Sequence, residues 1–219
     1  MKGITKTFGA LTANDRISLT LHRGEVLALL GENGAGKTTL MNILFGHYLP
    51  DAGDIEVFGA PLPHGSPRAA IARGVGMVHQ HFTLADRLSV LDNITLGTEK
   101  LWSLRSRKAA AKAKLASLSE KFGLTVDPDA LVSDLSVGER QRVEILKALY
   151  RDARVLILDE PTAVLTPQEA ERLFATLRRL VDTGLSVIFI SHKLNEVLDI
   201  STRFAVLRQG ALVATFERT

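Results

Sequence analysis

The chain has 219 residues, enough for one large α/β domain, and its 27 basic and 24 acidic residues leave a net charge of +3. This near balance, in spite of a pI of about 9.3, argues against a surface that coats nucleic acid. The absence of cysteine excludes disulfides and thiol catalysis and fits a cytosolic location, and no apolar run approaches the roughly 20 residues that cross a bilayer, so we expect any membrane association to come through a partner.

Two short segments at the start of the chain have the character of β-strands. Residues 3–9 come first, and residues 17–21 then alternate apolar and polar side chains, as a half-exposed strand does. We expect both segments to form an antiparallel layer. Phe8 could either stack on the ring of a bound ligand or pack within this layer.

A glycine-rich segment lies between a buried strand predicted over 25–30 and a helix predicted to open over 39–45. It reads Gly31-Glu32-Asn33-Gly34-Ala35-Gly36-Lys37-Thr38, the pattern G-x-x-x-x-G-K-[ST]. Its glycines let successive backbone N–H groups point inward, and the helix adds its positive N-terminal end. Lys37 would supply a cation for the β- and γ-phosphates of a nucleotide and Thr38 a hydroxyl for Mg²⁺, so the segment predicts a phosphate-binding loop.

The region from residue 50 to 80 returns to short elements. We expect a turn at 50–53, an edge strand at 54–59, a short helix with Ser66 as its N-cap and Gly74 just past its end, and a second core strand at 74–80. His79 and His81 would share one face of that strand and could bind a metal. Because no third ligand lies nearby in the sequence, a polar strand end is the better interpretation.

From residue 84 to 150 the pattern favours helices. An Ala- and Lys-rich helix is predicted over 105–122 with Gly123 as its stop. Its basic side chains are explained by a solvated face, and a specific acidic partner is the less favoured alternative; they are Arg105, Arg107, Lys108, Lys112 and Lys114.

Strand patterns resume at residue 155. We expect a buried strand at 155–158, an amphipathic helix at 167–182 closed by Gly184, and a strand at 185–190. A helix at about 194–199 and a hairpin spanning 204–215 complete the chain. No internal repeat is visible.

Two acids, Asp159 and Glu160, follow the buried strand at 155–158, where a parallel sheet presents its ligand site. Acidic surface residues at a strand end would explain one such carboxylate. Together with the phosphate loop, the pair favours Asp159 as a magnesium ligand and Glu160 as the group that polarises a water molecule in line with the γ-phosphate.

The segment 135–141 opens another predicted helix. Ser136 and Glu139 fit a capping box, which accounts for both residues locally. Gly138 is not explained in this way, since glycine in the first helical turn costs about 1 kcal/mol relative to alanine. We interpret it as a place where another group approaches the exposed N–H groups, and phosphate is the anion that a helix N-terminus prefers.

The order and spacing of these motifs resemble those of the ABC-transporter ATPase family over nearly the whole chain. The matching segments are the phosphate loop 31–38, Gln80 as the Q-loop, 135–141 as the LSGGQ-like signature, 155–159 as Walker B, Glu160 as the catalytic carboxylate and His192 as the switch histidine. The resemblance implies an α/β P-loop NTPase (RecA-like) core with a mainly parallel sheet in residues 1–83 and 151–219, an N-terminal antiparallel β layer, and an inserted α-helical subdomain at about 84–150.

The family resemblance also implies the site. In this family two domains sandwich two ATP molecules, each held by the phosphate loop of one domain and the signature helix of the other. The implied ATP ligands are Phe8 (on adenine), Gly31, Glu32, Asn33, Gly34, Ala35, Gly36, Lys37, Thr38, Thr39 and Gln80, with Ser136, Gly138 and Glu139 serving the partner's nucleotide. The implied ligands of Mg²⁺ are Thr38, Gln80 and Asp159. Glu160 and His192 are the implied catalytic residues.

Two positions depart from the common family pattern. Val137 replaces a signature glycine, and Thr166 stands where the D-loop usually ends in aspartate, which puts the aspartate contact across the dimer in doubt. Thr166 has a structural explanation as the start of a capping box with Glu169. These variants, with the residues around Gln80, look like the importer branch for nucleosides and simple sugars, in which this chain would be the first of two fused domains.

From this resemblance we expect an ATPase that powers an importer from the cytoplasmic side of the membrane. Its implied partners are transmembrane permease subunits, a second ATPase domain and, indirectly, an extracytoplasmic substrate-binding protein, with no nucleic acid. A soluble ATPase of the same family acting on nucleic acid or ribosomes is the alternative, and salt-dependent binding to RNA or DNA would favour it. A non-hydrolytic regulatory domain is a less favoured alternative, because Lys37, Asp159, Glu160 and His192 are all present.

Overall fold

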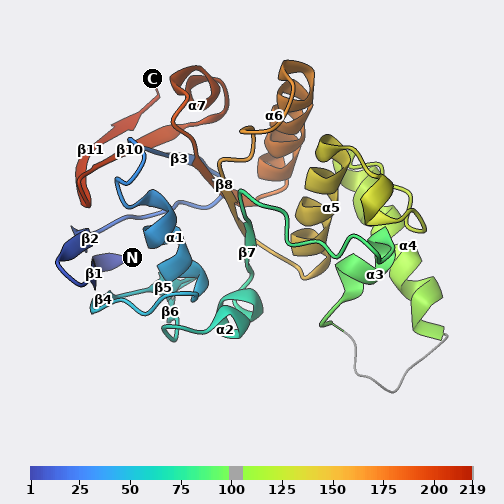
Figure 1. Cartoon of the computed structure of the whole chain (residues 1–219), viewed down its shortest axis with the longest axis horizontal. Helices are drawn as coiled ribbons and strands as arrows, with labels where there is room; N and C mark the ends of the chain where they lie inside the picture. Colours follow the sequence, from blue (N-terminus) through green and yellow to red (C-terminus); the bar gives the residue numbers. More distant parts are fainter. Residues whose placement is uncertain (99–105, 219) are drawn as a thin grey trace.

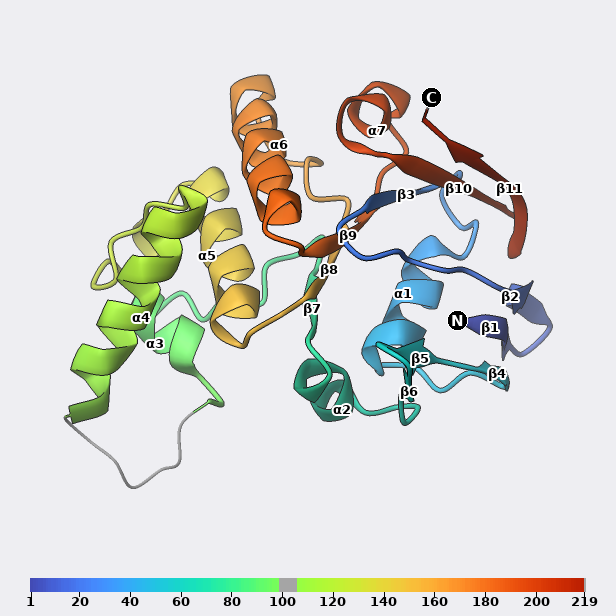
Figure 2. The same cartoon turned by 180° about the vertical axis from the view of Figure 1, so that it is seen from behind.

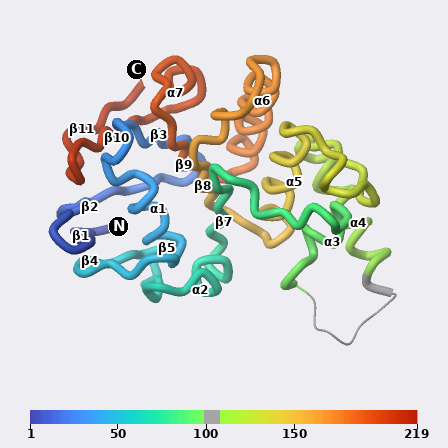
Figure 3. Tube along the Cα trace, in the orientation of Figure 1, coloured from blue at the N-terminus to red at the C-terminus, as the bar shows by residue number. Residues whose placement is uncertain are grey.

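The structure is a computed structural model that describes residues 1–98 and 106–218. Figures 1 and 2 show a sheet-containing body, with a group of helices to one side of it. The chain passes into these helices after β7 (Val75–Val78) and returns to the sheet at β8 (Val155–Asp159), as the trace in Figure 3 shows. In the described part of the chain, no helix combines the length and apolar content needed to span a membrane.

A six-stranded sheet forms the centre, in the order β11-β10-β3-β9-β8-β7. Its other strands are β3 (Val26–Leu30), β9 (Ser186–Ile190), β10 (Arg203–Arg208) and β11 (Ala211–Glu217). All pairs are parallel except β10 with β11, the terminal hairpin that the sequence predicted. The parallel strands β7, β8 and β9 are buried along their whole length, as their continuous apolar runs indicate.

Two hydrophobic clusters cover the two faces of this sheet. One contains α1 (Lys37–Phe45), α2 (Pro67–Ala72) and the N-terminal strands; the other contains the remaining helices. Those helices are α3 (Val90–Thr95), α4 (Ser106–Phe122), α5 (Val137–Tyr150), α6 (Pro167–Asp182) and α7 (Leu194–Ile200), with a short 3₁₀ turn at Val132–Asp134. The buried apolar side chains of the central strands therefore meet apolar partners on both faces of the sheet.

The predicted antiparallel layer is confirmed, but with different strands. It consists of β2 (Leu11–Ile17), β1 (Lys2–Phe8) and β4 (Ala52–Asp54) in that order. The strand predicted at 17–21 is wrong: β2 ends at Ile17, which still pairs with Ile4, and residues 18–21 form no strand. Just past this end, the Ser18 hydroxyl accepts the Gly3 N–H at 2.9 Å. Pairing with β1 stabilises 11–17 as a strand in spite of its polar composition.

The single edge strand predicted at 54–59 is also wrong. Ile55 is buried between two short strands, and β5 (Glu56–Val57) turns back onto β6 (Ala60–Pro61). Phe58 and Gly59 both have positive φ, 52° and 76°, as a tight hairpin requires. The core strand predicted to reach residue 80 ends at Val78.

The predicted helix boundaries hold well where a cap specifies them. Ser66 accepts the Ala69 N–H at the start of α2, and Thr166 with Glu169 forms a complete capping box at the start of α6. The helix predicted from Arg105 begins at Ser106, and Arg105 itself lies outside the described residues.

Candidate functional site

The phosphate-loop pattern lies between β3 and α1, at the carboxyl end of the parallel sheet. Gly36 has φ 98°, and a Cβ built there would lie 2.2 Å from the Ala13 carbonyl oxygen. A Cβ on Gly31 would lie 2.3 Å from the Leu207 carbonyl oxygen. Both positions therefore need glycine because other backbone comes within reach, and the buried Asn14 amide fixes the same turn by donating to the Gly36 carbonyl at 3.1 Å.

The N-terminus of α1 carries no protein cap. Gly36 is its N-cap residue, no side chain accepts from its first turn, and that turn contains no acidic residue. By contrast, Ser136 caps α5 and Thr166 caps α6. Uncapped N–H groups at the positive end of a nine-residue helix suit an anion, so this cradle fits the phosphates of a nucleotide.

The Lys37 ammonium group bends back over the loop. Its Nζ donates to the carbonyl oxygens of Gly31 at 2.6 Å and Glu32 at 2.9 Å. The side chain is almost wholly buried, and this burial lowers the pKa of Lys37, opposed by the nearby carboxylates of Glu160 and Asp159. A cation held in this way lies beside the cradle, where it can be shared with a bound polyanion.

Asp159 meets Thr38 at the edge of the cradle. The Thr38 Oγ1 donates to Asp159 Oδ1 at 3.3 Å. Burial raises the pKa of the Asp159 carboxyl, which is 4% exposed as a residue, while the Thr38 hydrogen bond lowers it. Hydroxyl and carboxylate oxygens are ligands that Mg²⁺ accepts, usually together with substrate phosphates, so this pair fits a magnesium ion bound with a nucleotide.

Glu160 and His192 also come together. His192 Nδ1 lies 3.2 Å from Glu160 Oε1, although the two residues follow different strands, β8 and β9. Glu160 has φ 46°, a conformation that residues with side chains rarely adopt, and its N–H donates to the Ile190 carbonyl at 3.1 Å. Backbone strain of this kind persists only where the surroundings hold it, and it is concentrated at functional sites.

Gln80 is exposed after the end of β7, and the described contacts include no hydrogen bond from it to Thr38 or Asp159. Its neighbour His79 stacks on His47 with ring centroids 5.3 Å apart. Burial lowers the pKa of His79. This packing accounts for His79 as a structural residue of the strand end.

Phe8 is 45% exposed on β1 and packs edge-on against Tyr48 with ring centroids 5.6 Å apart. The Lys6 ammonium lies 5.3 Å from the centroid of the same ring. Its exposed face leaves room for a flat ligand, and β2, the partner strand of β1, reaches the loop through Asn14.

The signature segment begins α5, and the predicted capping box is present. Ser136 N and Oγ both donate to Glu139 Oε2, at 2.9 and 2.8 Å. A Cβ on Gly138 would lie 2.6 Å from Glu169 Oε1, so the group that approaches this glycine within the chain is a side chain of α6. Sequence reasoning missed this contact because no motif connects Gly138 with Glu169.

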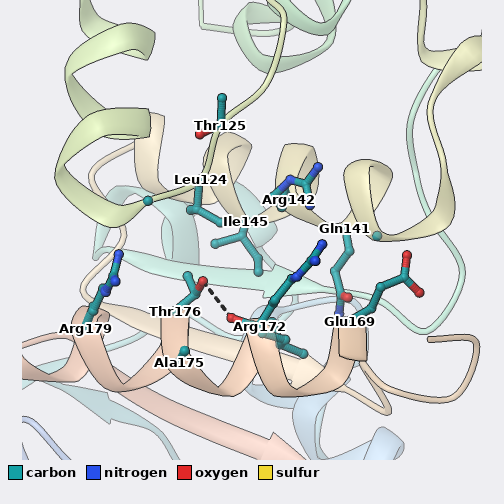
Figure 4. Close-up of a pocket in the computed structure, with 13 residues that line it drawn as sticks. Leu124, Thr125, Gln141, Arg142, Ile145, Glu169, Arg172, Ala175, Thr176 and Arg179 are labelled. Carbon is teal, nitrogen blue, oxygen red and sulfur yellow. Dashed lines mark hydrogen bonds between the residues drawn. The ribbon is translucent and has the colours of Figure 1, made fainter. Parts of the chain in front are cut away.

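A groove of about 380 Å³ runs between α5 and α6 beside this contact. Figure 4 shows Gln141 and Arg142 on α5 facing Glu169 and Arg172 on α6 across it. Gln141 is buried and donates to the Pro161 carbonyl at 2.7 Å, which ties the signature helix to the segment just after Glu160.

The signature helix and the phosphate loop are not brought together within the chain. In both Figure 1 and Figure 2, α5 and α1 lie on opposite sides of β8. Apart from Phe8 and Gln80, the residues predicted from sequence therefore fall into two groups: one at the loop with Asp159, Glu160 and His192, and one at the start of α5.

A phosphate loop at the first strand–helix turn of a parallel sheet, with an acid at the end of β8, one strand away from β3 across β9, defines a P-loop NTPase fold. The solved structure of the ADP conformation of an ATP-binding cassette of an ABC transporter has this fold, with a TM-score of 0.86 and 25% identity over 99% of this chain and 89% of that one. The sequence profile described as ABC transporter matches residues 14–163. The chain belongs to the ABC transporter family.

Similar curated proteins have names that refer to import. The chain is 50% identical over 217 residues to the nucleoside import ATP-binding protein NupA of Lactococcus lactis subsp. cremoris, covering 99% of this chain and 43% of that protein. It is 48% identical over 217 residues to the guanosine import ATP-binding protein NupO of Bacillus subtilis, covering 99% and 42%. It is 50% identical over 216 residues to the ribose import ATP-binding protein RbsA 2 of Burkholderia cenocepacia, covering 98% and 42%. The chain thus spans less than half the length of these relatives.

Proposed function

We propose that this chain binds and hydrolyses ATP to power an ABC importer for nucleosides or simple sugars. The observation that carries the proposal is the meeting of Lys37, Thr38, Asp159, Glu160 and His192 at the carboxyl end of one parallel sheet. The names of similar proteins refer to the import of nucleosides, guanosine and ribose, and this supports the proposed substrate class.

Different residues would bind different parts of the nucleotide and its metal ion. The segment 31–39 would hold the phosphates through its N–H groups and Lys37, and Phe8 would stack on adenine. Mg²⁺, held by Thr38 and Asp159 and approached by Gln80, would neutralise charge that builds up on the phosphate oxygens.

Hydrolysis needs a water molecule aligned with the γ-phosphate. Glu160 would accept a proton from that water and orient it. A protonated His192 can donate through Nδ1 to Glu160 and through Nε2 to a phosphate oxygen, because both ring nitrogens of an imidazolium are donors.

The separation of α5 from α1 supports a composite site with a second cassette. Ser136, Gly138 and Glu139 would then serve the nucleotide on the partner cassette at the N-terminus of α5, where the Ser136 cap and the Glu169 carboxylate beside Gly138 would have to give way to the phosphates. The match to less than half of each similar protein leaves room in those proteins for a second cassette in the same chain. The assembly would lie on the cytoplasmic side of the membrane, bound to permease subunits and served indirectly by a substrate-binding protein.

The proposal is tested by capture and reconstitution of the full-length protein. We expect a membrane permease to co-purify with it, and nucleoside or ribose with the binding protein to stimulate phosphate release in proteoliposomes. Salt-dependent capture of RNA or DNA, with no permease and no transport, would contradict the proposal.

A further inference from the structure

A single carboxylate on α7 lies behind the two loops that carry Glu160 and His192. Thr162 Oγ1 donates to Glu196 Oε2 at 2.6 Å, and Ser191 Oγ donates to the same oxygen at 3.0 Å. Thr162 follows Glu160 by two residues, and Ser191 directly precedes His192. One oxygen atom therefore joins the loop after β8 to the loop after β9.

The junction is buried and its polar atoms are matched. Thr162 is 3% exposed, Ser191 2%, and the Glu196 side chain 14%. The second carboxylate oxygen, Glu196 Oε1, pairs with Lys193 Nζ at 3.0 Å, and the Lys193 N–H donates to Ser191 Oγ at 3.0 Å. Hydrogen bonds to an ionised acceptor in a place shielded from water are short and strong, so this junction restricts both loops.

The two loops need such a restraint because of Glu160. Its left-handed backbone conformation, with φ 46°, is unfavourable for a residue with a side chain. Near Glu160, two other described hydrogen bonds join the loops. One is the Glu160–His192 contact itself, and in the other the Glu160 N–H donates to the Ile190 carbonyl at 3.1 Å. Without Glu196, the segment after Glu160 and the residue before His192 would lose the hydrogen bonds that hold them.

We propose that Glu196 is a positioning residue that fixes the separation and orientation of Glu160 and His192. This inference rests on the proposed ATPase function. Glu196 does not touch the nucleotide in this account; it acts through Thr162 and Ser191, which share its oxygen. Its loss should therefore affect the rate of hydrolysis and leave ATP binding at the phosphate loop unaffected.

The test measures steady-state ATP hydrolysis by the full-length protein assembled with its permease. We expect Glu196→Ala to lower kcat by about 10- to 100-fold with KM for ATP changed less than about threefold, since small displacements of reacting groups have effects of this size. Glu196→Gln keeps an acceptor oxygen for both hydroxyls and should retain most of the wild-type kcat.

Asp199→Ala is the matched control. Asp199 also lies on α7, and its carboxylate forms an ion pair with Arg178 at 2.9 Å, but the side chain is 53% exposed and has no described hydrogen bond to either loop. This variant should keep the wild-type kcat. Thr162→Val removes one arm of the junction with little change in volume and should reproduce the fall in kcat at unchanged KM.

The outcomes separate the inference from the function on which it rests. If the wild type hydrolyses ATP and Glu196→Ala and Thr162→Val both match Asp199→Ala in kcat, the positioning role is wrong and the ATPase function stands. The role is also wrong if KM rises in proportion as kcat falls. If the wild type neither binds nor hydrolyses ATP, the proposed function fails, and the inference fails with it.

Discussion

Thr38 and Asp159 lie 121 positions apart in the chain, and the Thr38 hydroxyl donates to the Asp159 carboxylate at 3.3 Å. The contact closes the phosphate loop onto the end of β8. Asp159 is held there at an energetic cost, because burial raises the pKa of its carboxyl above the ordinary value of 3.8. A carboxyl group buried at such a cost is more typical of a binding site than of a stable core.

The first prediction is that Asp159→Asn stabilises the ligand-free chain at neutral pH. A carboxyl whose pKa is higher in the folded state binds more protons there than in the unfolded state, so wild-type stability falls as pH rises from about 4 through the raised pKa. The stability of the asparagine variant should not fall with pH in this way, because its side chain does not titrate. Urea unfolding at pH 7 should show a higher midpoint for the variant, and the two curves should converge near pH 4; a lower midpoint at pH 7 would contradict this account.

The second prediction concerns Glu160. Glu160→Gln keeps the size of the side chain and its contact with His192 but cannot accept a proton, so we expect ATP binding to persist and hydrolysis to fall by about 10²- to 10⁴-fold. Phosphate release by the assembled transporter measures the rate, and equilibrium binding of labelled ATP serves as the control. Unchanged turnover would remove Glu160 from its proposed role.

The third prediction compares two glycines of the loop. A Cβ on Gly36 would meet the Ala13 carbonyl oxygen at 2.2 Å, whereas a Cβ on Gly34 has open space, and both residues have positive φ. Gly34→Ala should cost only the backbone strain, about 1–2 kcal/mol. Gly36→Ala adds a clash with backbone and should cost more than about twice as much, as measured by urea unfolding. Equal losses would show that β2 can move away from the loop.

The fourth prediction addresses Thr166. It caps α6 by accepting the Glu169 N–H, so Thr166→Ala should lower the free energy of unfolding by about 1 kcal/mol. Thr166→Asp keeps an acceptor for the Glu169 N–H but places a second carboxylate beside Glu169 Oε2, to which the Thr166 hydroxyl donates at 3.0 Å, so it should recover only part of this loss. Thermal unfolding of the three proteins checks this. A stable alanine variant would mean that packing alone fixes the start of α6.

Sequence predicted best the elements with a local physical signal. The bounds of α6 follow from the capping box at Thr166 and its closing glycine, and β8 follows from an apolar run of strand length. The strand β2 was misplaced because its side chains are polar and its stability comes from pairing with β1.

The residues of the candidate site also divide into those with a local signal in the sequence and those without one. Lys37, Thr38, Asp159 and Glu160 could be found from motifs, since each motif has a fixed spacing and a mechanical reason. The supporting contacts could not, because they join residues far apart in the chain by single hydrogen bonds. Asn14 on Gly36, Glu169 over Gly138, and Glu196 beneath Thr162 and Ser191 are contacts of this kind.

The central claim is that the cradle between β3 and α1 binds the phosphates of ATP, and calorimetry with Mg-ATP tests it most directly. We expect wild type to bind with measurable heat, and Lys37→Ala to bind at least about tenfold more weakly, a loss of about 1.4 kcal/mol or more. Lys121→Ala, which removes an exposed lysine at the end of α4, should bind as wild type does. Absence of binding by folded wild type, or identical binding by Lys37→Ala, would contradict the account.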